Sequence, residues 1–154
     1  LWPDMTWMFI LAYDVWNFEY TYLNLPTHSW YCGVALLLAP TFAAAFWNKG
    51  GWIQNRANTL ALWCMFAQVF PLFQDQGKFA VIPRLYADGF MDAATHPTAV
   101  DPAAQGVIAV LALAVNVVVF AAIVKRSIAL KKNPYKEEIW VGTPDYEEAM
   151  SRAE

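Results

Sequence analysis

Charged residues are scarce in this sequence. They make up 15% of its 154 residues, against roughly 25% in an average soluble domain. Hydrophobic residues make up 58% and gather in a few long runs, which is typical of a chain in a lipid bilayer rather than of one large soluble core. The formal net charge of −3 gives no reason to expect nucleic acid as a partner.

Cysteine and histidine are equally rare, with two of each. Cys32 and Cys64 lie in apolar segments without metal-ligand spacing, which favours buried, unreactive thiols over a disulfide. His28 and His96 form no i, i+4 pair and no HExxH pattern, so we predict no metal site and no cofactor. The sequence also lacks a nucleophile elbow, a phosphate loop and a dinucleotide fingerprint.

The start of the chain has no initiator methionine and no basic segment of a signal peptide; it reads Leu1-Trp2-Pro3-Asp4. We therefore expect the C-terminal part of a longer protein, in which the remaining transmembrane helices of the longer chain are partners of this part.

Four apolar stretches predict an all-α, polytopic helical membrane protein with about four transmembrane helices, and the lipid bilayer as its main partner. The expected spans are residues 5–23, 30–47, 58–73 and 106–124. Pro40 should kink the second span, with Thr41 available to satisfy the freed carbonyl. Asn116 interrupts the fourth span and is expected to hydrogen-bond to another helix.

Basic residues predict the orientation of these spans. Five of the ten Lys and Arg residues lie between Lys125 and Lys136, and Lys49 and Arg56 lie between the second and third spans. Because cytoplasmic loops carry an excess of Lys and Arg, both clusters are expected inside. We thus predict a multi-pass protein of the inner (plasma) membrane, with residues 127–154 as an acidic, solvated cytoplasmic tail.

The first span carries the best candidate site, a polar seam. Asp14, Asn17 and Thr21 follow i, i+3, i+7 spacing, so one side of a helix holds all three. A carboxylate near the bilayer midplane costs at least a few kcal/mol, roughly, so it usually faces other helices. The residues predicted to bind a ligand or ion on this first span are Tyr13, Asp14, Asn17 and Tyr20.

The seam is expected to face polar side chains of the third span, Thr59, Trp63 and Gln68. Arg56 is the natural counter-charge, although Asp14 should lie too deep for a direct ion pair, and an ordinary cytoplasmic anchor is the favoured interpretation of Arg56. The structural alternative for Asp14 is that it hydrogen-bonds neighbouring side chains and only fixes helix packing.

Several short segments, in a fixed order along most of the chain, carry a family resemblance. They are Trp2-Pro3-Asp4, Tyr13-Asp14, Trp16-Asn17, Tyr20, Pro26, His28-Ser29, Tyr31, Gly33, Lys49-Gly50, Trp52, Gln54, Arg56-Ala57, Thr59-Leu60-Ala61-Leu62-Trp63, Lys78-Phe79-Ala80-Val81 and Asn133-Pro134-Tyr135-Lys136-Glu137-Glu138-Ile139. In these the chain resembles an uncharacterised family of bacterial integral membrane proteins, defined only as a domain of unknown function. The resemblance implies a longer protein with spans before Trp2 and supplies no activity, cofactor or catalytic residue.

Three functional hypotheses remain open. The first is a membrane protein of transporter or sensor type that binds a small polar ligand at the seam. The second is a structural or accessory subunit in which the same seam only holds helices together. The third, an intramembrane enzyme that uses Asp14 or Glu19 as acid or base, is the weakest, because no second catalytic group lies at a recognisable spacing.

Overall fold

The computed structural model describes residues 6–24, 33–70 and 102–153, and all regular structure in these ranges is helical. The elements are α1 (Trp7–Asn24), η1 (Gly33–Leu38, one stretch of π-helix), α3 (Ala39–Phe46), α4 (Trp52–Val69), α5 (Pro102–Leu130) and α6 (Pro144–Ala153). The π-helix η1 continues directly into α3, whose second residue is Pro40. A change of helix type therefore lies directly on the N-terminal side of Pro40.

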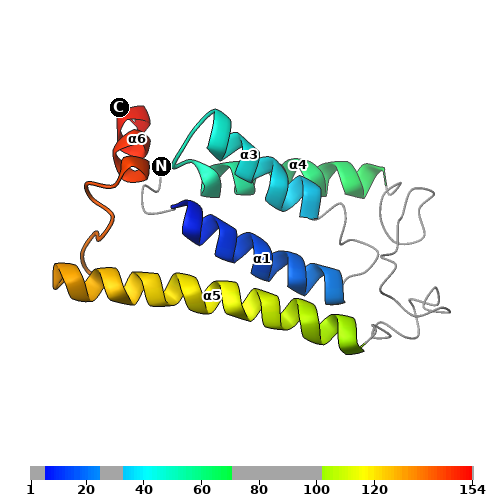
Figure 1. Cartoon of the computed structure of the whole chain (residues 1–154). Coiled ribbons are helices and arrows are strands. Elements are labelled where there is room, and N and C mark those ends of the chain that lie inside the picture. The colour runs from blue at the N-terminus through cyan, green and yellow to red at the C-terminus, as the bar shows by residue number, and fades with distance from the viewer. Residues whose placement is uncertain (1–5, 25–32, 71–101, 154) are drawn as a thin grey trace.

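Helix α1 lies between α5 on one side and the pair α3 and α4 on the other (Figure 1). It packs against α5 and η1, while α3 packs against α4. Neighbouring helices run in opposite directions, so the start of α1, the turn between α3 and α4 and the end of α5 lie at one end of the bundle. Helix α6 lies at that same end (Figure 1).

A tight turn joins α3 to α4. Gly50 has a φ of +83°, a conformation that glycine adopts without steric cost. The backbone N–H of Gly51 donates to the carbonyl of Asn48 over 2.9 Å. The side-chain amides of Asn48 and Asn55 bond to each other in both directions, over 2.7 and 3.2 Å, so this turn fixes the start of α4.

One cluster of the core in the described part forms around Trp52, the first residue of α4, which is 0% exposed. Ala44 of α3 is buried beside it, and Ile10, Tyr13 and Ile53 pack around this pair. The rings of Tyr13 and Trp52 meet edge to face with centroids 5.0 Å apart. Residues of α1, α3 and α4 thus converge on a single indole.

The prediction of about four transmembrane helices is wrong. Among the described helices, α5 alone is long and apolar enough to cross a membrane, over Gly106–Leu130 with a mean hydropathy of 3.0 in its best window. One such helix is a limited indication of membrane association, because the core helix of a soluble protein passes the same test. In α5, however, only 11% of that window is buried, which is unlike a core helix.

The other predicted spans fail for reasons that are visible in their composition. Asp14, Asn17 and Glu19 lower the hydropathy of α1. The apolar stretch Ala35–Phe46 is too short. Helix α4 starts at Trp52, six residues before the predicted 58–73, and so includes the polar residues Gln54, Asn55 and Arg56 that lie before this range. Short apolar and aromatic runs in the sequence resemble membrane spans. The helices that contain these runs also carry amide and charged side chains, which make them too polar or leave them too short to cross a membrane.

Two smaller expectations also change. The residues after α5 do not remain a solvated tail, because α6 forms there and Ile139 and Ala149 are 3% and 1% exposed. Asp145 and Glu147 in the first turn of α6 complement its positive N-terminal dipole. Cys64 is an exposed free cysteine rather than a buried one, whereas Cys32 lies outside the described residues.

Candidate functional site

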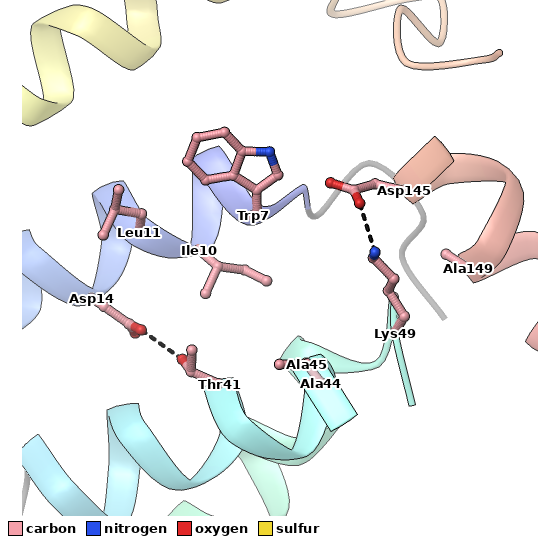
Figure 2. Close-up of a pocket in the computed structure, with 11 residues that line it drawn as sticks. Trp7, Ile10, Leu11, Asp14, Thr41, Ala44, Ala45, Lys49, Asp145 and Ala149 are labelled. Atoms are coloured by element: carbon pink, nitrogen blue, oxygen red, sulfur yellow. Dashed lines mark hydrogen bonds and ion pairs between the residues drawn. The ribbon is translucent and has the colours of Figure 1, made fainter. Parts of the chain in front are cut away.

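A cavity of about 470 Å³ lies between α1, α3 and α6. Its wall is mostly apolar and is formed by Trp7, Ile10, Leu11, Ala44, Ala45 and Ala149. Its polar groups lie at two ends, as Figure 2 shows: Asp14 and Thr41 at one end, and Lys49 and Asp145 at the other. An apolar wall with a few polar groups is the usual composition of a small-molecule site.

Hydrogen bonds fix one oxygen of the Asp14 carboxylate. The Thr41 hydroxyl donates to Asp14 Oδ2 over 2.5 Å, and the Trp52 Nε1–H donates to the same Thr41 oxygen over 2.9 Å. Because Trp52 is held in the core, this chain of bonds orients both the hydroxyl and the carboxylate. Thr41 therefore bonds Asp14 across helices, in addition to any role beside Pro40.

The second oxygen of Asp14 has no such partner. Asp14 Oδ1 is buried and accepts no hydrogen bond within the described part of the chain. A buried carboxylate oxygen without a donor costs free energy, because water no longer solvates it. Asp14 as a residue lines the cavity, although this oxygen itself is buried.

The electrostatic state of Asp14 reflects this burial. Loss of water contact raises the pKa of the Asp14 carboxyl from 3.8 to about 6, although the Thr41 hydrogen bond and the positive charge of Arg56 act in the opposite direction. The group is therefore mostly ionised above pH 7 and mostly protonated at about pH 5.

Arg56 influences Asp14 from a distance. No ion pair within 4.0 Å joins the two side chains. The Nε and Nη1 groups of Arg56 are buried and donate to no acceptor among the described residues. The Gln54 Oε1 atom on the same helix is also buried without a partner there.

The other end of the cavity is closed by α6. Lys49 Nζ lies 2.7 Å from Asp145 Oδ1 and 3.0 Å from Glu148 Oε2, and the bonds to these carboxylates raise the pKa of Lys49 above its ordinary value of 10.5. Arg152 donates to the Trp47 carbonyl over 2.7 Å. These contacts hold α6 on the α3–α4 turn, with Ala149 against the cavity.

A protein-family model described as "Family of unknown function (DUF5692)" matches residues 1–152. The chain belongs to the DUF5692 family. The expected resemblance to a domain of unknown function is thereby confirmed. No curated protein and no solved structure matches the chain. Family membership assigns no activity, so any function has to be argued from the site itself.

The structure of this DUF5692 chain separates the predicted site residues. Asp14 lines the cavity, whereas Tyr13 packs its ring on Trp52 and on Trp16. Asn17 is half-buried on α1, and Tyr20 is 50% exposed.

The predicted residues on α4 lie elsewhere. Trp63 is half-buried, with its ring near that of Phe66, at a centroid distance of 6.4 Å. Arg56 reaches Asp14 only through its charge. The side chain of Gln68 lies outside the described part. The seam that was expected to join α1 to Trp63 and Gln68 therefore stays a prediction, while the cavity brings together Asp14, α3 and α6.

Sequence reasoning missed four residues of this DUF5692 site, namely Thr41, Lys49, Trp52 and Asp145. Thr41 was interpreted only as a companion of Pro40, although a hydroxyl near a kink can also bond to another helix. Lys49 was counted only as a basic loop residue, and its acidic partner Asp145 is 96 positions further on. Nothing in the spacing of this pair predicts contact.

Proposed function

We propose that this chain is a membrane-associated protein that binds a small organic cation in the cavity between α1, α3 and α6. The observation that carries the proposal is the Asp14 carboxylate at one end of a mostly apolar cavity, with one buried oxygen unpartnered among the described residues. An ammonium group in the cavity would pair with the Asp14 carboxylate, and its charge would match the ionised form of that group above pH 7.

The rest of the cavity supports the same ligand class. Trp7, Ile10 and Leu11 offer apolar contact to the body of a ligand. A volume of about 470 Å³ suits a small molecule. The charge of Lys49 at the far end is balanced by Asp145 and Glu148, so it repels a cation little. The ligand we infer is therefore an amine with a compact hydrocarbon or aromatic body.

The test compares benzylamine with benzyl alcohol, which has a similar shape and no charge. Thermal unfolding of the purified full chain in detergent is measured above pH 7 with each compound. We expect benzylamine to raise the melting temperature of the wild type, and benzyl alcohol to leave it unchanged. In Asp14→Asn, which keeps the shape of the side chain, the benzylamine effect should disappear. An equal rise in the variant would contradict the proposal.

We further propose that α5 crosses the plasma membrane with its C-terminal end in the cytoplasm. Val110, Leu113, Val118 and Phe120 on α5 are each more than 60% exposed. Soluble monomers rarely expose so large an apolar surface, and lipid tails would cover it. Lys125 and the basic residues after Leu130 support a cytoplasmic C-terminal end by the positive-inside rule.

A structural or accessory role is the second candidate, and one contact favours it. Asn116 of α5 donates to the Ala12 carbonyl of α1 over 3.2 Å, as a polar residue does when it joins helices. In this alternative, Asp14 likewise serves only to fix α1 to α3 through Thr41. Asp14→Asn separates the two candidates: a variant that unfolds in mild detergent favours the structural role, and a folded variant without amine binding favours the ligand site.

A further inference from the structure

The chain turns sharply where α5 ends. Helix α5 stops at Leu130, and Lys131 has a φ of +54°, which is uncommon for a residue other than glycine. The backbone N–H of Lys132 donates to the Ser127 carbonyl over 3.0 Å, and that of Lys131 to the Ile128 carbonyl over 3.2 Å. This left-handed cap ends the apolar helix and places the next residues beside its end.

A second set of bonds orders the segment after this cap, Lys131–Lys136, here named the basic turn. Asn133 Oδ1 accepts from the Tyr135 N–H over 2.9 Å, and Glu137 Oε2 accepts from the Asn133 N–H over 3.1 Å. The Asn133 carbonyl accepts from the N–H groups of Lys136 and Glu137. The turn holds Tyr135 outward, with 94% of the side chain exposed.

Arg126 ties the following segment to the last turns of α5. Its Nε–H donates to the Ile139 carbonyl over 2.6 Å, and its guanidinium lies 5.2 Å from the centre of the Trp140 ring. Because Ile139 is 3% exposed, this return of the chain is packed. The basic turn therefore has a fixed place at the end of the apolar helix.

At the end of α5, basic and acidic side chains differ in how many of them are paired. Lys125, Lys131 and Lys136 are exposed, and their ammonium groups pair with no side chain that the structure describes. The acidic side chains between residues 137 and 148 all have partners in backbone N–H groups or basic side chains, namely Glu137, Glu138, Asp145, Glu147 and Glu148. Although residues 127–154 are acidic in sum, the end of α5 presents free lysines.

We infer that the basic turn and Lys125 bind the phosphate groups of anionic phospholipids at the membrane surface. The inference rests on the proposed membrane association of α5. Ile128, three residues before Lys131, is 71% exposed, so exposed apolar surface and exposed lysines occur together at the end of α5, as lipid tails and charged headgroups do at a membrane surface. Tyr135 lies between these lysines, and aromatic residues concentrate at this depth. Each free lysine should contribute about a fivefold preference for an anionic surface.

The test measures which lipid stays with the protein. The full chain is purified in dodecyl maltoside micelles that contain equal amounts of phosphatidylcholine and phosphatidylglycerol with identical acyl chains, and the bound lipids are quantified by mass spectrometry. We expect phosphatidylglycerol to be enriched with the wild type. The triple variant Lys125→Gln, Lys131→Gln, Lys136→Gln should return to the supplied ratio. The matched triple arginine variant should keep the enrichment, because its charges are retained.

Several outcomes separate this inference from the proposals on which it rests. If the glutamine variant enriches phosphatidylglycerol as much as the wild type does, the lipid-binding inference is overturned. The inference is also overturned if the wild type needs detergent for extraction from membranes and yet shows no enrichment. That second result would leave the membrane proposal intact. A wild type that is released without detergent would instead overturn the membrane proposal and this inference together. Excess inorganic phosphate should leave the enrichment unchanged, and competition by free phosphate would overturn the inference by showing that the lysines bind a soluble anion.

Discussion

At the scale of single residues, Thr41 makes two hydrogen bonds in the site with one hydroxyl group. Its hydroxyl donates to Asp14 Oδ2 and at the same time accepts from the Trp52 indole N–H. One side chain therefore satisfies a carboxylate on α1 and a buried donor on α4. Removing the hydroxyl would leave both groups without their partner.

We expect Thr41→Val to lower the free energy of unfolding by about 1–3 kcal/mol, because it leaves a buried donor and a carboxylate oxygen unpaired while it keeps the side-chain volume. Thr41→Ser is the matched control, since it retains the hydroxyl, and should lose much less. Chemical unfolding of the two variants in detergent measures the difference. A Thr41→Val protein as stable as the serine variant would show that the hydrogen-bonded chain contributes nothing.

The raised pKa of Asp14 predicts a pH dependence of stability. The folded state holds the proton with a pKa of about 6 and the unfolded state with one near 3.8, so between these values the folded state binds more protons. Stability from this group therefore rises as the pH falls from about 7 to about 5. We expect the stability of the wild type to increase relative to Asp14→Asn over that range. A difference between the two proteins that is constant with pH would contradict the burial of this carboxyl.

The sequence shows that Asp14 is unusual, but it does not show which side chains surround this residue. A carboxylate within an apolar run is conspicuous because its burial is costly, so it can be found without a structure. Its partner Thr41 is 27 residues away and small enough to fit any helix face. Tyr13 was expected to bind a ligand, whereas its ring packs on Trp52, since local spacing does not tell which neighbour a helix face meets.

At the scale of elements, α6 depends on contacts with a distant turn. Lys49 holds Asp145 and Glu148, and Arg152 holds the Trp47 carbonyl. The ion pairs are partly exposed, so each is worth about 0.2–1 kcal/mol. Ala149 adds a small buried contact at the cavity.

We expect Lys49→Gln to loosen α6 without unfolding the bundle. Amide hydrogen exchange in residues 144–153 should become faster, by up to about thirtyfold, because the two lost ion pairs together contribute at most about 2 kcal/mol. Lys136→Gln removes the same charge from an exposed lysine of the basic turn and should leave this exchange rate unchanged. Equal exchange in Lys49→Gln and the wild type would mean that α6 is held by other contacts.

The sequence predicts where helices lie better than it predicts how many of them cross a membrane. The predicted range 5–23 overlaps α1, and the predicted range 106–124 lies within α5, because long apolar runs are easy to recognise in a sequence. The predicted 58–73 misplaced the start of α4, since the Asn48–Asn55 amide pair and Gly50 define a turn that composition does not show. Helix α6 was missed because its residues are mostly polar and because its contact with Lys49 joins residues far apart in the sequence.

At the scale of the whole molecule, the apolar surface extends over several helices. Beyond α5, Leu62 and Val69 on α4 and Phe46 and Trp47 on the α3 side are each more than 60% exposed. Among the described residues, fewer hydrophobic side chains are buried than large hydrophobic ones are exposed. So much exposed apolar surface requires a cover, and on α5 we propose that lipid tails supply it.

Extraction of membranes from cells that express the full chain tests this central claim most directly. After an alkaline carbonate wash and ultracentrifugation, we expect the protein in the pellet and its release only by detergent, because the apolar face of α5 lies among lipid tails. Protein that remains in the supernatant without detergent, or that carbonate releases, would contradict the claim that α5 crosses the membrane.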